Sequence, residues 1–186
     1  MYTRIIRWWL SGIVLLGLPA IFFIYSLAYP GLNQKGDRIG IPVRIKIVSI
    51  GVDAVIEQVA ITDDGLMDVP KFPVNTGWYS LGPRPGESGS AVIDGHVDDE
   101  RGDKAVFSDL HNLRPGDKIE VQDDRGLLVS FIVRESRRYD PDADSSEIFI
   151  SNDERSHLNL ITCEGTWDEA SKSYSQRLVV FTDREM

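Results

Sequence analysis

The sequence predicts an all-β domain, a barrel or a sandwich of roughly seven or eight short strands with only short helices. Between residues 41 and 182, runs rich in Val and Ile alternate with polar residues and are separated by turn residues, the pattern of half-buried strands. No repeat of about 20 to 50 residues recurs along the chain, which excludes a solenoid or a propeller. A domain of about 145 residues buries an adequate core without disulfides.

The first half of this domain is expected to contain two long strands, at residues 41–50 and 53–61, on either side of Gly51. A turn at 62–65 leads to a brief strand at 66–69. Residues 70–90 contain four prolines and four glycines, so we expect a loop with at most one helical turn there.

The second half begins with a short strand at residues 90–95, which ends at His96. Residues 104–113 place apolar side chains at helical spacing and predict one short amphipathic helix. Strands follow at 118–121 and 127–134 around a hairpin turn, then a polar loop at 141–146 with the composition of a helix start. The last two strands are expected at 158–162 and 177–182.

The N-terminus has the features of a membrane anchor. Residues 8–29 contain no charged side chain and follow Arg4 and Arg7; about 20 apolar residues cross the bilayer core of about 30 Å as a helix. The positive-inside rule then places residues 1–7 in the cytoplasm and residues 30–40 as an external linker. A cleaved signal peptide is the alternative, but the length favours an uncleaved single-pass anchor in the cell membrane.

The charge of the external part excludes one class of partner. The chain has 20 Lys and Arg against 29 Asp and Glu, a net charge of −9, and residues 1–30 contain no acidic residue. All the acidic residues therefore lie in the linker and in the domain at residues 41–186. Nucleic-acid binding needs clustered Lys and Arg, so we expect no nucleic-acid partner.

Cys163 is the only cysteine of the chain and ends the apolar run at 158–162. It has no disulfide partner within the chain. In an external domain such a thiol is incidental, a link to another chain, or a nucleophile. A buried thiol behaves as a small hydrophobic side chain, and the residue type alone does not choose between these interpretations.

A cysteine nucleophile needs a proton carrier and a group that stabilises an oxyanion. His96 ends one predicted strand and Arg177 begins another, so both lie at strand ends, as Cys163 does. His111 and His157 compete with His96 as the proton carrier, although about 20 Å of extended strand would separate residues 157 and 163. From the residues alone, Cys163, His96 and Arg177 form a plausible site.

Several motifs in this order resemble the sortase family. They are the Ala91-Val92-Ile93-Asp94-Gly95-His96 strand end, the Leu160-Ile161-Thr162-Cys163 strand end, and Arg177 in Ser175-Gln176-Arg177-Leu178-Val179-Val180. The likeness extends over residues 40–183. The stretch 47–55, Gly77-Trp78-Tyr79, Pro83-Arg84-Pro85-Gly86 and residues 107–116 are most similar to class F sortases. Asn159 departs from the pattern, because many sortases have threonine there.

The resemblance implies an eight-stranded β-barrel and a transpeptidase acting on a Leu-Pro-x-Thr-Gly-like (LPxTG-like) sorting signal of secreted proteins. By that likeness Cys163 forms a thioester with the threonyl carbonyl, His96 is the acid and base, Arg177 binds substrate and stabilises the oxyanion, and Thr162 helps to orient the peptide. The acceptor amine would come from a peptidoglycan precursor or a pilin lysine. No cofactor and no metal are expected.

Three further alternatives stay open. The acidic run at Asp98, Asp99, Glu100 and Asp103 suggests calcium, but it lacks the spacing of a defined calcium loop and is more typical of a solvated loop. A non-catalytic, membrane-tethered barrel that binds wall polymer or a surface protein would make the thiol incidental. A cysteine protease would differ only in its acceptor. Residues 165–174 are the expected mobile substrate loop.

Overall fold

The computed structural model describes residues 39–186. The predicted anchor at residues 8–29 and most of the predicted linker lie outside the described residues. Within residues 39–186, no helix is both long and apolar enough to cross a membrane.

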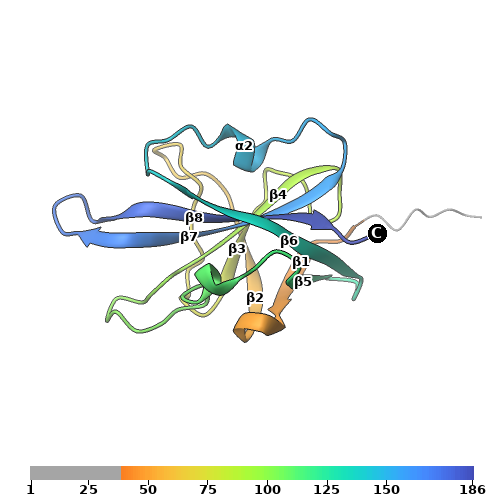
Figure 1. Cartoon of the computed structure of the whole chain (residues 1–186), viewed down its shortest axis with the longest axis horizontal. Coiled ribbons are helices and arrows are strands. Elements are labelled where there is room, and N and C mark those ends of the chain that lie inside the picture. Colours follow the sequence, from red (N-terminus) through yellow and green to blue (C-terminus); the bar gives the residue numbers. More distant parts are fainter. Residues whose placement is uncertain (1–38) are drawn as a thin grey trace, which may run out of the picture. The chain divides into compact units, whose positions relative to one another are not determined.

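Eight strands close into a barrel in the order β1-β2-β3-β4-β7-β8-β6-β5 (Figure 1). Closure comes from antiparallel pairing of the first strand with β5, which leaves no free sheet edge. This confirms the eight-stranded barrel. The strands are β1 Pro42–Ile47, β2 Val52–Val59, β3 Thr76–Tyr79, β4 Gly89–Gly95, β5 Lys118–Asp123, β6 Leu128–Tyr139, β7 Ser156–Asp168 and β8 Ser173–Arg184.

Two of the eight pairings are parallel and the others antiparallel. β2 runs parallel to β3, and β4 runs parallel to β7. Because parallel strands end at the same edge of a sheet, the residue after β4 and the C-terminal part of β7 lie on one side of the barrel. β8 pairs antiparallel with β7, so its N-terminal part reaches the same side.

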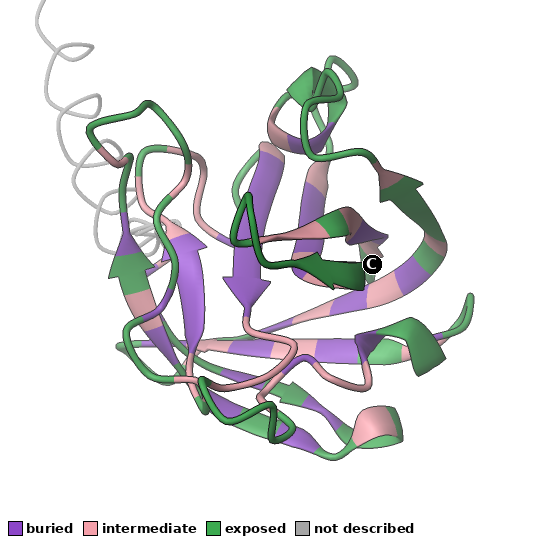
Figure 2. Cartoon of the chain, turned by 90° about the vertical axis from the view of Figure 1, so that its left-hand side faces the viewer, coloured by how far each residue is buried: buried purple, intermediate pink, exposed green. Residues whose placement is uncertain are grey.

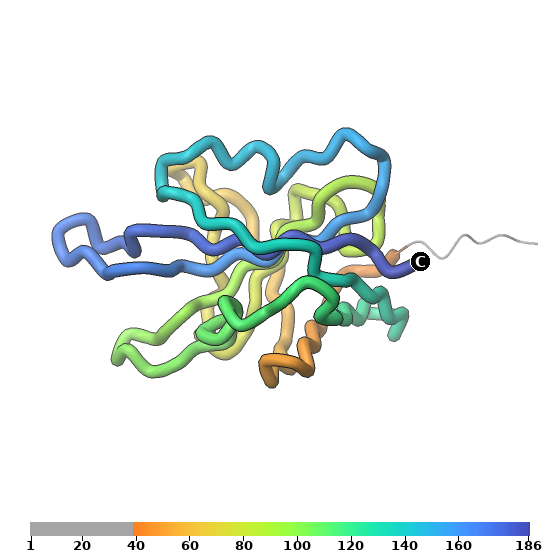
Figure 3. The backbone as a smooth tube through the Cα atoms, in the orientation of Figure 1, coloured from red at the N-terminus to blue at the C-terminus, as the bar shows by residue number. Residues whose placement is uncertain are grey.

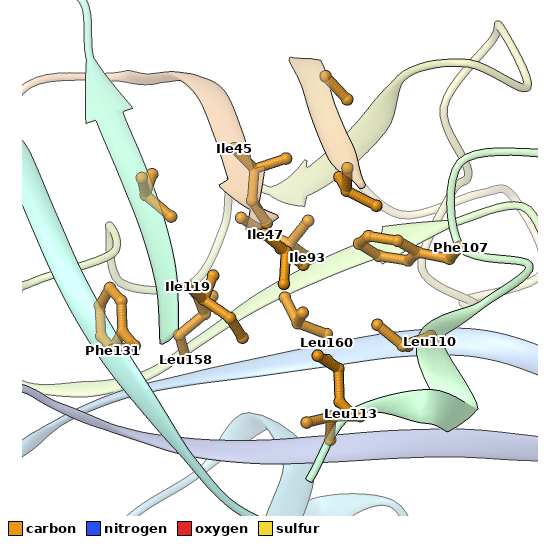
Figure 4. Packing of buried hydrophobic residues seen from close by; sticks show 14 of the residues in the cluster. Ile45, Ile47, Ile93, Phe107, Leu110, Leu113, Ile119, Phe131, Leu158 and Leu160 are labelled. Atoms are coloured by element: carbon orange, nitrogen blue, oxygen red, sulfur yellow. The ribbon is translucent and has the colours of Figure 1, made fainter. Parts of the chain in front are cut away.

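The barrel interior is filled by alternate side chains of every strand, as the period of two requires. Figure 4 shows them converging, with Phe107, Leu110 and Leu113 packed among the strand residues. Figure 2 shows that buried residues concentrate on the strands and exposed residues on the connections. The largest fully buried side chains include Phe107, Phe131, Ile45, Ile47, Ile93, Leu110, Ile119, Leu158, Leu160 and Leu178.

A second, smaller apolar cluster covers part of the outer face of the barrel. Val92 of β4 and Val179 and Phe181 of β8 pack there against Ile148, which belongs to the short helix α2 (Ser146–Phe149). The polar loop predicted at 141–146 thus leads into a helix, although one of a single turn. β4, β7 and β8 are therefore covered on both faces for part of their length.

The connection between β2 and β4 differs from the prediction. The brief strand predicted at 66–69 is wrong, because this segment makes one isolated bridge, between Ile61 and Met67. The region predicted as a loop contains β3 instead. Its four residues pair with β2 and β4, and Thr76 and Trp78 are buried. Tertiary pairing overrides the weak local signal of a strand between prolines and glycines.

The amphipathic helix predicted at residues 104–113 is also wrong. Only the 3-10 helix η2 (Leu110–Asn112) forms there. The N–H groups of Ala105 and Phe107 instead donate to the carbonyls of Val97 and His96, at 3.2 and 2.9 Å. The apolar spacing is real, because the side chains enter the core, but the backbone of the first half is committed to another segment.

The expected mobile loop at residues 165–174 is mostly a β-hairpin, since β7 continues to Asp168 and β8 starts at Ser173. In Figure 3 the tip of this hairpin extends beyond the neighbouring strands. The ladder shifts register between Glu164 and Trp167, and the ring of Trp167 packs edge-on against Tyr174 with centroids 5.3 Å apart.

Candidate active site

Cys163 and Arg177 are direct neighbours across the β7–β8 ladder. Leu160 and Leu178 point into the barrel, so the alternation of side chains places Cys163 and Arg177 on the outer face. Cys163 is half-buried, and its thiol is free. The structure therefore brings together two of the residues selected from the sequence, on the same face of adjacent strands.

His96 follows the last residue of β4, on the strand next to β7. The parallel register pairs Asp94 with Ile161, so His96 comes two residues after one partner and Cys163 two residues after the other. Both lie at the same end of their strands, on the outer face. The third residue selected from the sequence thus joins the other two.

Thr162 holds these two strand ends together. Its side chain is buried, and its hydroxyl donates to the carbonyl of Gly95 at 2.7 Å. Since Thr162 precedes Cys163 and Gly95 precedes His96, this bond fixes Cys163 and His96 relative to each other. The geometry does not favour peptide binding through the Thr162 hydroxyl, which leaves the backbone of this residue for that task.

The imidazole of His96 has one partner in the described chain. Its Nε2 lies 2.8 Å from the carbonyl oxygen of Pro70. A carbonyl only accepts, so Nε2 carries a hydrogen in this arrangement. Nδ1 is then the nitrogen left to exchange a proton with a reactant.

Arg177 is held by its own segment of the chain. Its Nη1 donates to the carbonyls of Tyr174 and Gln176, each at 3.0 Å, and its Nη2 donates to Ser173 Oγ at 3.1 Å. These bonds use three of the five guanidinium hydrogens. The group is thus oriented beside the thiol with donors to spare for an anionic or carbonyl oxygen.

Electrostatics at Cys163 oppose one another. Burial raises the pKa of the thiol above its usual value, and the positive charge of Arg177 counteracts this. The carboxylates of Asp94 and Asp98 raise the thiol pKa further. The resting thiol is therefore protonated, and a reaction at neutral pH needs a base such as His96 to take its proton.

Two residues that sequence reasoning did not place in the site border it. The hydroxyl of Tyr174 donates to the carboxylate of Asp98, across the segments that carry Arg177 and His96. This bond, together with burial, raises the pKa of Tyr174 to about 12. The other is Asp94, which is buried and has one oxygen without a hydrogen-bond partner. Its position two residues before His96, on the same face of a strand, was the available signal.

The two rival histidines lie elsewhere. His111 belongs to η2, and its Nδ1 bonds to the carbonyl of Ser108 at 3.1 Å. His157 is buried at the start of β7, between Asp183 at 2.8 Å and Asp153 at 2.9 Å. Neither shares the strand end of Cys163.

Two carboxylates of the acidic run after His96, those of Asp99 and Asp103, are paired within the run itself. Asp99 accepts backbone N–H groups from Arg101 and Asp103, at 2.8 and 3.0 Å. The guanidinium of Arg101 forms ion pairs with the carboxylates of Asp99 and Asp103. In the part of the chain that the structure describes, no three His, Cys, Asp or Glu side chains are grouped to hold a metal ion.

Comparison with curated proteins found no match. Comparison with solved structures found sortases. Sortase A from Corynebacterium diphtheriae is 20% identical, with a TM-score of 0.61 over 88% of this chain and 69% of that one. Sortase C2 of Group B Streptococcus Pilus Island 1 is 24% identical, with a TM-score of 0.59 over 77% and 73%. Sortase C1 from Streptococcus agalactiae is 19% identical, with a TM-score of 0.60 over 84% and 71%.

At these identities the structural likeness shows a shared fold. The family is shown by a match between residues 45–185 and the family model described as the sortase domain. This match spans the barrel from within β1 to the end of β8, including the strand ends that carry His96, Cys163 and Arg177. The chain belongs to the sortase family.

Proposed function

We propose that the chain is a cysteine transpeptidase in which Cys163 is the nucleophile, His96 carries the proton and Arg177 stabilises the oxyanion. The observation that carries this function is the direct pairing of Cys163 with Arg177 on the outer face of β7 and β8. The bond between Thr162 and Gly95 adds His96 to the same strand ends. Family membership supports it, because sortases are generally cysteine transpeptidases.

In the first half of the reaction, His96 takes the thiol proton and Cys163 Sγ attacks the carbonyl carbon of a threonine in the bound peptide. The carbonyl oxygen becomes negative and is stabilised by the free N–H groups of Arg177. The C–N bond to the following glycine then breaks. His96 gives its proton to the departing amine, and the acyl group remains on sulfur as a thioester.

In the second half, an amine attacks the thioester carbon and His96 accepts its proton. The C–S bond breaks, a new peptide bond forms, and the thiolate is restored beside Arg177. His96 then returns the proton to sulfur. The two half-reactions balance without a cofactor, because no electron is gained or lost.

We take the substrate to be an LPxTG-like sorting signal, cleaved between Thr and Gly, and the acceptor an amine of a peptidoglycan precursor or a pilin lysine. The sequence motifs around His96 and Cys163 support this choice through their likeness to the sortase family. Residues 8–29 would anchor the enzyme in the cell membrane with the barrel outside. The motifs at residues 77–86 and 107–116 support assignment to class F.

Cleavage of a quenched fluorescent LPxTG peptide tests the function. We expect wild-type protein to cleave it and to join the fragment to an added amine, with mass spectrometry separating transfer from hydrolysis. Cys163→Ala should abolish both. His111→Ala, which removes a histidine outside the site, serves as the control and should retain full activity. Full activity of Cys163→Ala would remove the thiol from the mechanism.

One observation favours the second candidate, a non-catalytic barrel that binds wall polymer or a surface protein. Burial raises the pKa of Cys163, as expected of an inert thiol. Alkylation separates the two functions. A catalytic thiol served by His96 should react with iodoacetamide near neutral pH and lose reactivity in His96→Ala, whereas an inert thiol should resist the reagent in both proteins.

A further inference from the structure

Asp94 is a buried carboxyl group that the proposed reaction does not use. It lies on the outer face of β4, two residues before His96, and pairs with Ile161 of β7, two residues before Cys163. The group therefore sits one row below the reacting residues, on the same face of the same two strands. Only 9% of Asp94 is exposed.

The space for this carboxyl exists because residue 77 is a glycine. Gly77 of β3 is paired with Asp94, and a Cβ there would collide with Asp94 Oδ1. The same Cβ would meet Val59 Cγ1 at 2.9 Å and Pro70 Cδ at 3.1 Å. Asp94 thus fills an enclosed gap beside Pro70, whose carbonyl also holds the ring of His96.

The carboxyl is poorly satisfied in this gap. Oδ1 is buried and has no hydrogen-bond partner, which strongly disfavours an ionised carboxylate. Burial, together with the negative charges of Asp68 and Glu57, raises the pKa of Asp94 to about 8, against the opposing effect of the backbone N–H groups of Asp94 and Gly77. At neutral pH Asp94 is mainly the neutral acid.

The charged groups that face Asp94 and Cys163 come from several elements. Asp68 and Glu57 act on Asp94, from the segment before β3 and from β2. Lys71 lies near Glu57 and partly offsets it. Arg177 of β8 and Asp98 of the segment after β4 act on Cys163, and so does Asp94 itself. His96 and Tyr174 complete the set of titratable groups at the site.

We propose that Asp94 is a positioning residue that keeps its proton while Cys163 releases one, so that the thiolate forms beside a neutral acid instead of a second negative charge. When Asp94 ionises in alkaline solution, it disfavours the thiolate. Ionisation of either group, Asp94 or Cys163, therefore raises the pKa of the other. This role belongs to the site of the proposed transpeptidase and rests on that function.

The pH dependence of Cys163 alkylation tests the role, and it requires no sorting peptide. Asp94→Asn keeps the shape of the neutral acid and removes its charge. We expect the midpoint of iodoacetamide reactivity against pH to fall by roughly half a pH unit or more. The reaction should be about threefold faster between about pH 8 and the midpoint, where Asp94 is ionised in the wild type. Asp103→Asn removes an exposed carboxylate that does not act on Cys163, and should leave the midpoint unchanged.

A midpoint in Asp94→Asn equal to that of wild type would overturn the role. If this variant does not fold, the wild-type protein gives the answer by infrared titration. We expect the carbonyl band of a protonated carboxylic acid at pH 7 and its loss above pH 9, in the wild type and in Cys163→Ala alike, because Asp94 ionises before the thiol. Absence of the band at pH 7 would also overturn the role. A protein without transpeptidase activity would still show these shifts, so the two failures are distinguishable.

Discussion

Two buried aspartates at opposite places in the barrel have opposite environments. Asp123, at the end of β5, is 4% exposed and accepts N–H groups from Gly40, Arg125 and Leu127 at 2.7, 2.9 and 2.8 Å. Burial acts against ionisation there, but these bonds outweigh it and hold its pKa below the usual range. Asp94, only slightly more exposed, has an unpaired oxygen and a pKa of about 8.

The two buried or half-buried histidines of the β4–β7 wall differ in the same way. His157 is enclosed by two carboxylates, whereas His96 has one carbonyl partner and a free Nδ1. His157 and Asp123, away from Cys163, are thus hydrogen-bonded through both ring nitrogens and through three backbone N–H groups, respectively. His96 and Asp94, next to Cys163, each keep one polar atom without a hydrogen-bond partner. This costs stability and leaves hydrogen-bonding capacity for a reactant.

Replacing each of the two histidines by alanine should separate the catalytic role of His96 from the structural role of His157. We expect His96→Ala to lower the rate of peptide transfer by about 10²- to 10⁴-fold, because proton transfer is lost, with little change in urea unfolding. His157→Ala should instead lose about 2 kcal/mol of stability, since two carboxylates lose a donor, and keep its rate while folded. Equal losses of activity in the two folded variants would contradict the distinction.

The stability of the protein against pH should report Asp94 directly. Its native pKa is raised, so between about pH 4 and pH 8 the native state holds a proton that the unfolded state has lost. Stability therefore falls as pH rises through this window, by at most about 1.4 kcal/mol per unit. We expect Asp94→Asn to be more stable than wild type at pH 7, with a difference that shrinks toward pH 4.

Urea unfolding of both proteins at pH 5, 6, 7 and 8 measures this difference. All other titrating groups are common to the two proteins, so the difference isolates Asp94. Parallel stability curves would show that Asp94 ionises normally in the native state, and the contrast with Asp123 would then disappear.

Much of the barrel could be predicted because its strands alternate. The runs at 90–95, 118–121, 127–134, 158–162 and 177–182 all form strands, and three of their ends carry His96, Cys163 and Arg177. β3 was missed because only pairing with β2 and β4 makes its four residues a strand. The helix at 104–113 was wrong because bonds to residues 96 and 97 are not visible in local spacing.

The environment of Asp94 could not be predicted for a related reason. The sequence places an aspartate two residues before His96, but its unpaired oxygen depends on Gly77 lying opposite and on Pro70 closing the gap. Both come from a segment predicted as a loop. Burial and charge at the site arise only when the barrel closes, so they cannot be read from the order of the strands in the sequence.

Asp123→Asn should show the pH dependence opposite to that of Asp94→Asn. The pKa of Asp123 is lowered, so its contribution is present above the ordinary aspartate pKa near 4 and is lost as pH falls through its native pKa. At pH 7 we expect a loss of about 1–3 kcal/mol, because the new amide group opposes a backbone N–H. In urea unfolding this loss should diminish near pH 3; a loss independent of pH would point to packing instead of charge.

The smallest effect is expected from Tyr174→Phe. The hydroxyl of Tyr174 joins the segment of Arg177 to that of His96 through Asp98, while the ring packs against Trp167. The substitution removes the hydroxyl and keeps the ring. We expect kcat/KM to fall about fivefold, equivalent to about 1 kcal/mol, because the two arms of the site are then less well fixed.

A double-mutant cycle with Asp98→Asn distinguishes positioning from bulk charge. If the bond acts as a unit, the double variant should be no slower than the slower single variant, and the coupling should approach the full effect of Tyr174→Phe. Additive losses would mean that Asp98 acts on Cys163 by its charge alone. In that case Asp98→Asn, but not Tyr174→Phe, should shift the pH profile of Cys163 alkylation, as Asp94→Asn does.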